Sequence, residues 1–69
     1  MQRQPVGSEA VNSIGYDPRR RTLVVEFRKG RVYEYLEVPE ATYRELMEAE
    51  SIGNFVSTRI KPYFRFRRR

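Results

Sequence analysis

Apolar and polar residues alternate in the first half of the chain, and this alternation predicts β-strands. Leu23, Val25 and Phe27 occupy every second position between polar or smaller neighbours, as expected of a strand with one buried face. Shorter runs of similar character lie on either side of this segment. The predicted strands cover residues 11–16, 22–28 and 31–37.

Two turn segments separate these strands. Asp17-Pro18-Arg19-Arg20 is a turn because proline presets the backbone of the second turn position and aspartate bonds back to the chain just ahead of it. Lys29-Gly30 is the other, since glycine adopts the positive φ of a tight hairpin without strain. Short turns join neighbouring antiparallel strands, so this half of the chain predicts a three-stranded antiparallel β-meander.

The register of the second hairpin follows from the cost of burying a charge. With a two-residue loop, Glu34 lies opposite Val25 on the face that carries the large apolar side chains. A buried carboxylate without a partner is strongly destabilising. A three-residue loop with Gly30 as its left-handed residue places Tyr33 and Tyr35 on that face instead. The sequence therefore favours the three-residue loop.

The second half of the chain has helical spacing. Tyr43, Leu46 and Met47 recur at helical intervals and predict a helix over residues 39–50. Ser51 is a suitable N-cap for a second, shorter helix. The apolar stripe of that helix, which Pro62 ends, consists of Ile52, Phe55, Val56 and Ile60.

Together these elements predict a small α+β domain. The expected fold is a three-stranded antiparallel β-meander followed by a two-helix hairpin packed on one face of the sheet. The expected core consists of Ile14, Leu23, Val25, Phe27, Tyr33, Tyr35, Leu46, Met47, Ile52, Phe55, Val56 and Ile60.

Composition restricts the function of this domain. The chain has 69 residues, enough for one small domain, and contains neither cysteine nor histidine. It therefore lacks a thiol nucleophile, thiolate ligands and the commonest general base, and we expect no enzyme, no metal site and no small-molecule cofactor. Its longest apolar run is Leu23-Val24-Val25, and no signal peptide is apparent. We expect no contact with a membrane and a cytoplasmic location.

The charge changes sign along the chain. Fourteen Lys and Arg against nine Asp and Glu give a net charge of +5, and only Lys29 and Lys61 among the cations are not arginine. Residues 19–31 carry six cations and one acid, residues 37–50 carry one cation and five acids, and residues 59–69 carry six cations and no acid. Because the guanidinium fork suits phosphate, the two basic segments indicate a surface for a polyanion.

A set of aromatic, glycine, proline and aliphatic positions is spread over most of the chain. They are Phe27, Gly30, Tyr33, Tyr35, Val38, Pro39, Tyr43, Leu46, Ser51, Gly53, Phe55 and Ile60. In this order the set resembles the KTSC domain, a short module found at the C-terminus of some lysyl-tRNA synthetases and as a free-standing small bacterial protein. The resemblance implies a KTSC-like domain over residues 11–63 of a free-standing protein, after a flexible lead-in at 1–10 and before a basic tail at 64–69. It implies little about activity, and RNA binding is only a suggestion attached to the family.

Three segments are candidates for a nucleic-acid interface. Tyr33 and Tyr35 share one sheet face and either stack unpaired bases or close the core beneath the helices, and the register argument favours the core. Arg19-Arg20-Arg21 either contacts phosphates or is a solvated turn, and the tail either grips a nucleic-acid backbone or is a disordered solubilising segment. The candidate nucleic-acid-binding residues are Arg19, Arg20, Arg21, Arg59, Lys61, Tyr63, Arg65, Arg67, Arg68 and Arg69.

The expected topology gathers these cations at one end of the molecule. An antiparallel second helix returns the chain, so the tail leaves beside the turn at residues 17–21. We therefore expect a non-catalytic module that binds RNA or another single-stranded nucleic acid through an arginine-rich surface. The alternative is a protein-interaction or self-associating module that uses an exposed strand edge or an acidic helix face, formed by Glu37, Glu40, Glu45 and Glu48.

Overall fold

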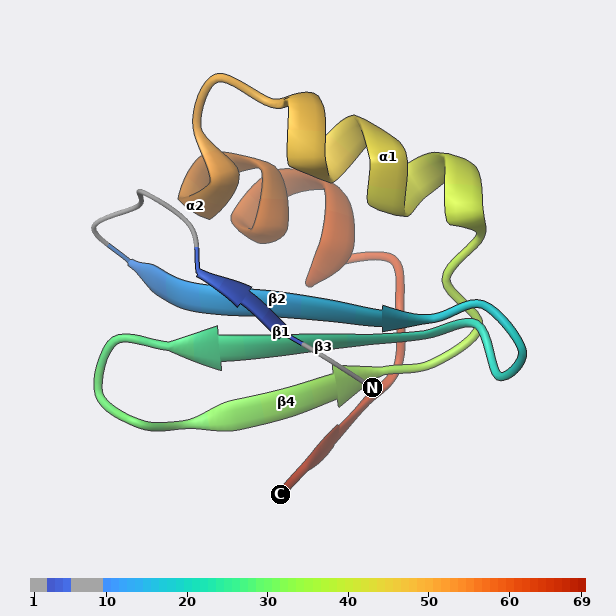
Figure 1. Cartoon of the computed structure of the whole chain (residues 1–69), viewed down its shortest axis with the longest axis horizontal. Coiled ribbons are helices and arrows are strands. Elements are labelled where there is room, and N and C mark those ends of the chain that lie inside the picture. The colour runs from blue at the N-terminus through green and yellow to red at the C-terminus, as the bar shows by residue number, and fades with distance from the viewer. Residues whose placement is uncertain (1–2, 6–9) are drawn as a thin grey trace.

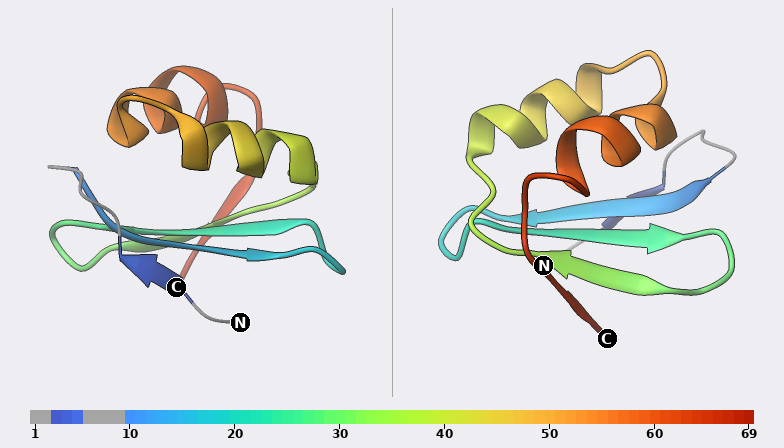
Figure 2. Two further views of the ribbon diagram at one scale, coloured as in Figure 1. Left: turned by 45° about the horizontal axis from the view of Figure 1, so that its top comes forward. Right: turned by 180° about the vertical axis from the view of Figure 1, so that it is seen from behind.

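The computed structural model describes residues 3–5 and 10–69 and is an α+β fold with two layers. One layer is a five-stranded antiparallel sheet in the order β1-β2-β3-β4-β5, and the helices cover one face of it (Figures 1 and 2). The strands are β1 (Arg3–Pro5), β2 (Val11–Asp17), β3 (Thr22–Phe27), β4 (Val32–Tyr35) and β5 (Phe66–Arg68). The helical segments are α1 (Glu40–Glu48), α2 (Ile52–Phe55) and η1 (Val56–Ile60).

The predicted meander is the centre of this sheet, and both chain ends extend it. Arg3–Pro5, in the predicted flexible lead-in, pairs with β2 as β1, while residues 1–2 and 6–9 lie outside the described part of the chain. Phe66–Arg68, in the predicted tail, pairs with β4 as β5. The tail is therefore an edge strand of the same sheet and not a disordered segment.

The predicted register of the β3–β4 hairpin is confirmed. Tyr35 lies opposite Leu23 and Tyr33 opposite Val25, while Glu34 lies opposite Val24 on the other face. Gly30 has φ +82°, and the backbone N–H of Phe27 donates to the carbonyl of Arg31 across the turn. A three-residue loop with a left-handed glycine therefore keeps the Glu34 carboxylate out of the core.

Both predicted helices are present close to their predicted bounds, the first as α1 and the second as α2 continued by η1. Ser51 caps α2 as expected, because its hydroxyl accepts a hydrogen bond from the backbone N–H of Asn54 at 3.2 Å. The predicted second helix changes its winding at Val56, where η1 continues as a π-helix. The N–H of Lys61 then donates to the carbonyl of Val56, five residues back, at 2.9 Å.

The core lies between the helices and the inner sheet face. Nine buried residues form it: Val11, Ile14, Leu23, Val25, Tyr35, Val38, Leu46, Val56 and Ile60. Several predicted core residues are only half-buried against this cluster, namely Phe27, Tyr33, Met47, Ile52 and Phe55. Because Phe27 and Tyr33 are only partly buried, part of each ring is exposed on the helix-facing side of the sheet.

One end of the sheet is closed by contacts among β2, α1 and the segment before α1. The Tyr16 and Tyr43 rings stack with centroids 4.7 Å apart, and the Tyr16 hydroxyl donates to the carbonyl of Val38. The Val38 N–H donates to the carbonyl of Arg21, whose φ is +52°. These contacts fix the β2–β3 turn beside the start of α1.

Candidate functional site

A row of aromatic rings crosses the helix-facing side of β3, β4 and β5. The Phe27 and Tyr33 centroids lie 5.4 Å apart in an edge-to-face arrangement, and those of Tyr33 and Phe66 lie 5.1 Å apart in the same arrangement. Tyr35 joins the row from the buried side, with its ring centroid 5.9 Å from that of Phe66. Phe66 is 55% exposed, so the row ends in an apolar ring that water reaches.

A groove at the hairpin end of the sheet exposes part of this aromatic row. It has a volume of about 430 Å³, and we call it the hairpin groove. Its described lining residues are Ala10, Phe27, Arg28, Lys29, Arg31, Tyr33 and Lys61. Four of these side chains are cationic and none is acidic, so the groove combines aromatic walls with positive charge.

Lys61 links the helical layer to the hairpin groove. It follows η1 directly, and its Nζ lies 5.2 Å from the centroid of the Phe27 ring, which is within cation–π range. This contact places one cation from the helical layer next to those of the β3–β4 turn.

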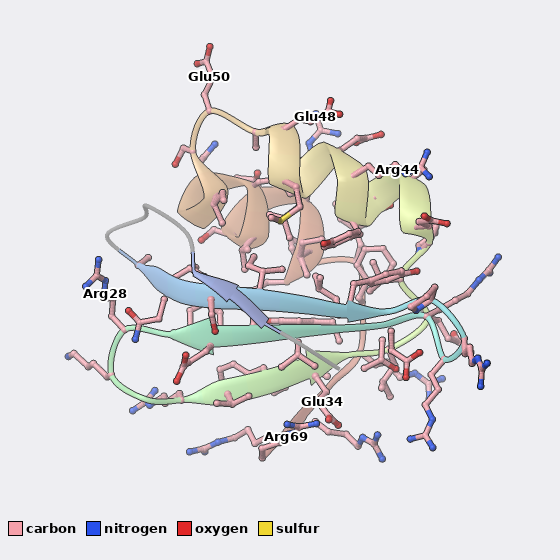
Figure 3. All side chains as sticks on the ribbon, in the orientation of Figure 1. Arg28, Glu34, Arg44, Glu48, Glu50 and Arg69 are labelled. Carbon is pink, nitrogen blue, oxygen red and sulfur yellow. The ribbon has the colours of Figure 1, made fainter. Side chains whose placement is uncertain are left out.

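Two arginines of β5, Arg67 and Arg68, and the next residue, Arg69, alternate between the two sides of the sheet, and we call these three the β5 arginines. Arg68 lies opposite Tyr33 on the aromatic side. Arg67 and Arg69 both reach the Glu34 carboxylate on the other side, with N–O distances of 3.2 Å and 2.6 Å. Figure 3 shows Arg69 beside Glu34 along this edge of the sheet. Glu34 therefore neutralises part of the charge of the tail and holds it against β4.

The two tyrosines of the Tyr33-x-Tyr35 pair differ in burial and in surroundings. Tyr35 is only 2% exposed and belongs to the core, as the register argument favours. Its burial, with a further contribution from Tyr33, raises the pKa of its hydroxyl above the usual 10.0. Tyr33 is half-buried and lines the hairpin groove, so it packs on the core and also presents surface to a ligand.

The candidate cations do not gather at one end of the molecule, and that expectation is wrong. Arg65 does begin the tail near the β2–β3 turn, because its carbonyl accepts from Leu36 while the Arg21 carbonyl accepts from Val38. From there β5 runs back along β4, and the Arg69 N–H donates to the carbonyl of Val32 at the opposite end. Pairing with β4 thus spreads the tail arginines along the sheet edge.

The remaining candidates fall into two further places. Arg19 and Arg20 are exposed in the β2–β3 turn, where the Asp17 carboxylate accepts hydrogen bonds from both of their backbone N–H groups. Arg59 and Tyr63 line a different groove of about 400 Å³ in the helical layer, together with the acidic side chain of Glu45. Neither place joins the hairpin groove.

The acidic residues of the α1 region are exposed, opposite the sheet. Glu48 and Glu50 project from the helical layer in Figure 3, and Glu40 forms an ion pair with Arg44 at 3.1 Å. Glu37 and Glu45 are exposed as well. The molecule therefore has an acidic helical side, and its hairpin groove lies elsewhere, next to the sheet.

Sequence reasoning missed three cations of the hairpin groove. Arg28, Lys29 and Arg31 belong to the basic segment at residues 19–31, but the sequence did not assign them to a site. The predicted register of the hairpin could have indicated this site, because it placed Tyr33 on the same face as Phe27, next to this turn. Phe66 carried no such signal, since only the pairing of β5 with β4 brings its ring to Tyr33.

The residues that carried the family resemblance have mainly architectural roles. Val38, Leu46 and Ile60 are core residues, Gly30 is left-handed, and Ser51 is an N-cap. Residues 7–64 match the KTSC domain. The chain belongs to the KTSC domain family. A crystal structure of a KTSC domain protein from Yersinia pestis has a TM-score of 0.95 and 46% identity, over 99% of this chain and 96% of that one.

Relatives of this KTSC chain fall into two groups by length. A protein from Tsukamurella paurometabola is 45% identical over 62 residues, which are 90% of this chain and 92% of that protein. A lysine–tRNA ligase from Nostoc punctiforme is 36% identical over 63 residues, which are 91% of this chain but 11% of the ligase. The domain thus forms nearly the whole of one relative and a small segment of the other. Within the described part of the chain, the helices are too short and too polar to cross a bilayer.

Proposed function

We propose that this KTSC protein is a small non-catalytic module that binds RNA in single-stranded form. The binding surface consists of the hairpin groove, the exposed ring of Phe66 and Arg68 on the same side of the sheet. It continues around the sheet edge to Arg67 and Arg69, which lie on the other side. The observation that carries the proposal is the aromatic row of Phe27, Tyr33 and Phe66, bordered by cations from the turn, from β5 and from the end of η1.

This combination suits single-stranded nucleic acid on physical grounds. Arginine and lysine neutralise phosphates, and exposed rings stack on unpaired bases at about 1–3 kcal/mol per base. Unpaired bases offer their faces to such rings, whereas the bases of a duplex are stacked on one another. The tRNA ligase relative supports RNA rather than DNA, because its name gives tRNA as its substrate.

A double-variant experiment tests where RNA binds. Arg31→Ala/Arg68→Ala removes two cations next to Tyr33, and Arg19→Ala/Arg20→Ala removes two from the β2–β3 turn at the other end of the sheet. Both variants lower the net charge equally. Fluorescence anisotropy with a labelled single-stranded RNA should show that affinity falls at least tenfold in the first variant and much less in the second. Equal losses would mean that only net charge matters.

A protein-interaction module is the second candidate function, and the exposed acids of the α1 region favour it. In that case Glu37, Glu45, Glu48 and Glu50 would meet a basic protein partner, and the β5 edge would be open to a further strand. Glu45→Gln/Glu48→Gln separates the two functions. It should leave RNA affinity unchanged or slightly raised, whereas it should weaken retention of a protein partner. Size-exclusion chromatography of the unchanged chain tests self-association directly.

A further inference from the structure

The hairpin groove has the form of a small-molecule site within the larger RNA surface. Its volume of about 430 Å³ lies in the range of roughly 300–1,000 Å³ that ligand pockets occupy. The walls of the groove come from three different parts of the chain, namely Ala10, the segment 27–33 and Lys61.

The charges of the groove select an anionic ligand. Arg28, Lys29 and Arg31 come from the β3–β4 turn, and Lys61 comes from the end of η1. No described lining residue is acidic, and Glu26, which precedes Phe27 in the chain, accepts a hydrogen bond from Ser13 at 2.9 Å. The three cations Lys29, Arg31 and Lys61 together suit a phosphate group, which offers several acceptor oxygens.

The walls of the groove add a flat apolar surface beside those cations. Phe27 and Tyr33 both line it, and they hold each other in an edge-to-face arrangement at 5.4 Å. Phe66 supports Tyr33 from the β5 side. A ligand that carries both a planar ring system and a phosphate contacts both the aromatic walls and the cations of the groove, whereas phosphate alone contacts only the cations.

We propose that the hairpin groove binds a nucleoside phosphate, with the base against Tyr33 and Phe27 and the phosphate among Lys29, Arg31 and Lys61. The nucleoside phosphate is either a free nucleotide or the 5′-phosphorylated end of an RNA strand. The inference rests on the proposed function and deepens it, because it assigns the phosphorylated nucleotide to one part of the RNA surface.

Titrations with three small probes test the two halves of the groove separately. Adenosine 5′-monophosphate, adenosine and inorganic phosphate are each added to ¹⁵N-labelled protein, and backbone amide shifts are followed by NMR. The monophosphate should shift the amides of residues 28–33 and bind at least about tenfold more tightly than either fragment. Equal binding of monophosphate and inorganic phosphate would overturn the role of the aromatic walls, and absence of shifts at residues 28–33 would overturn the site.

Two groove variants and one control variant locate the interaction. Arg31→Ala should weaken monophosphate binding about tenfold by removing a charged donor, and Tyr33→Leu should weaken it by removing the stacking ring. Arg19→Ala, in the β2–β3 turn, should have no effect. Because Tyr33 also packs on the core, circular dichroism must show a folded Tyr33→Leu protein, and Arg31→Ala carries the test on an exposed residue. Unchanged monophosphate affinity in folded Arg31→Ala would contradict the proposal.

A comparison of two RNA strands separates the sources of the nucleotide. A short strand with a 5′-phosphate and the same strand without it are titrated against the protein. If the phosphorylated strand binds more tightly, and Arg31→Ala abolishes this difference, the groove binds strand ends. If both strands bind equally while the monophosphate still shifts the amides of residues 28–33, the groove binds free nucleotides. If monophosphate shifts are absent while both strands still bind through Arg68, the groove assignment fails and the proposed RNA function stands.

Discussion

Glu34 holds Arg69 by two contacts to the same carboxylate oxygen. The Arg69 Nε donates to Oε2 at 2.7 Å, and a terminal guanidinium nitrogen lies 2.6 Å from the same atom. The Glu34 side chain is 14% exposed, whereas that of Arg69 is 53% exposed. One half-enclosed carboxylate therefore fixes a solvated arginine and, with it, the edge strand that carries the β5 arginines.

Glu34→Gln tests whether this carboxylate anchors the tail. The amide keeps the shape but loses the charge. Because both arginine partners of Glu34 are largely exposed to solvent, the free energy of unfolding should fall by no more than about 1 kcal/mol. Hydrogen exchange at the backbone amides of residues 66–69 should become faster. RNA affinity should rise, because Arg67 and Arg69 lose their competitor and the net charge increases by one.

Glu48→Gln is the matched control for that variant. It makes the same change of charge on an exposed residue of α1, away from the tail. Exchange at residues 66–69 should stay as in the unchanged protein. If both variants raised RNA affinity equally, the effect would be one of net charge and not of release of the tail.

Gly30→Ala tests the hairpin turn that shapes the groove. The backbone has φ +82° at this position, so alanine should lower the free energy of unfolding by about 1 kcal/mol through backbone strain alone. A steric clash is not the cause, since the space around an added Cβ is open. Gly30→Asn should cost less, because asparagine adopts the left-handed region more readily. Denaturant unfolding of the two variants measures this difference.

Tyr16 gives the stability of the fold a dependence on alkaline pH. Burial raises the pKa of its hydroxyl above the usual 10.0, and Glu40 and Asp17 raise it further while Arg21 opposes them. The unfolded chain therefore releases this proton first. The contribution of Tyr16 to stability is complete below pH 10.0 and is lost as the pH rises through the folded-state pKa.

Tyr16→Phe separates this contribution from the other groups that titrate at high pH. At neutral pH the variant should lose about 1 kcal/mol, because the Val38 carbonyl loses its hydrogen bond from the hydroxyl. Above pH 10 its stability should fall less steeply than that of the unchanged protein. Denaturant unfolding between about pH 8 and pH 11 measures both effects, and parallel curves would contradict the assignment to Tyr16.

The sequence predicts the elements whose stability depends on local patterning and on the burial of charge. The three-residue β3–β4 loop follows from Glu34 alone, because the other register would bury its carboxylate. The Ser51 cap is equally local, since it depends on one side chain and a backbone N–H three residues away. Both were correct, and each rests on a cost that a few neighbouring residues decide.

The edge strands are not predictable in this way. Phe64-Arg65-Phe66-Arg67 alternates aromatic and charged residues, but over too short a run to mark a strand. Phe66–Arg68 pairs with β4 through contacts to Tyr33, Tyr35 and Glu34, which lie about thirty residues earlier in the chain. This pairing also moved the tail arginines away from the β2–β3 turn. The sequence therefore identified the basic residues of the candidate site, but long-range pairing determined which of them lie together.

The salt dependence of RNA binding by the intact chain and by Arg65→Ala/Arg67→Ala/Arg68→Ala/Arg69→Ala tests the central claim most directly. If the surface neutralises about four phosphates, affinity for a single-stranded RNA should fall about 50-fold between roughly 50 and 200 mM salt. The variant should bind more weakly at low salt and show a shallower dependence, by about 0.7 in the log–log slope for each phosphate that the protein no longer neutralises. Absence of binding by the intact chain at low salt, or identical slopes for the two proteins, would contradict the account.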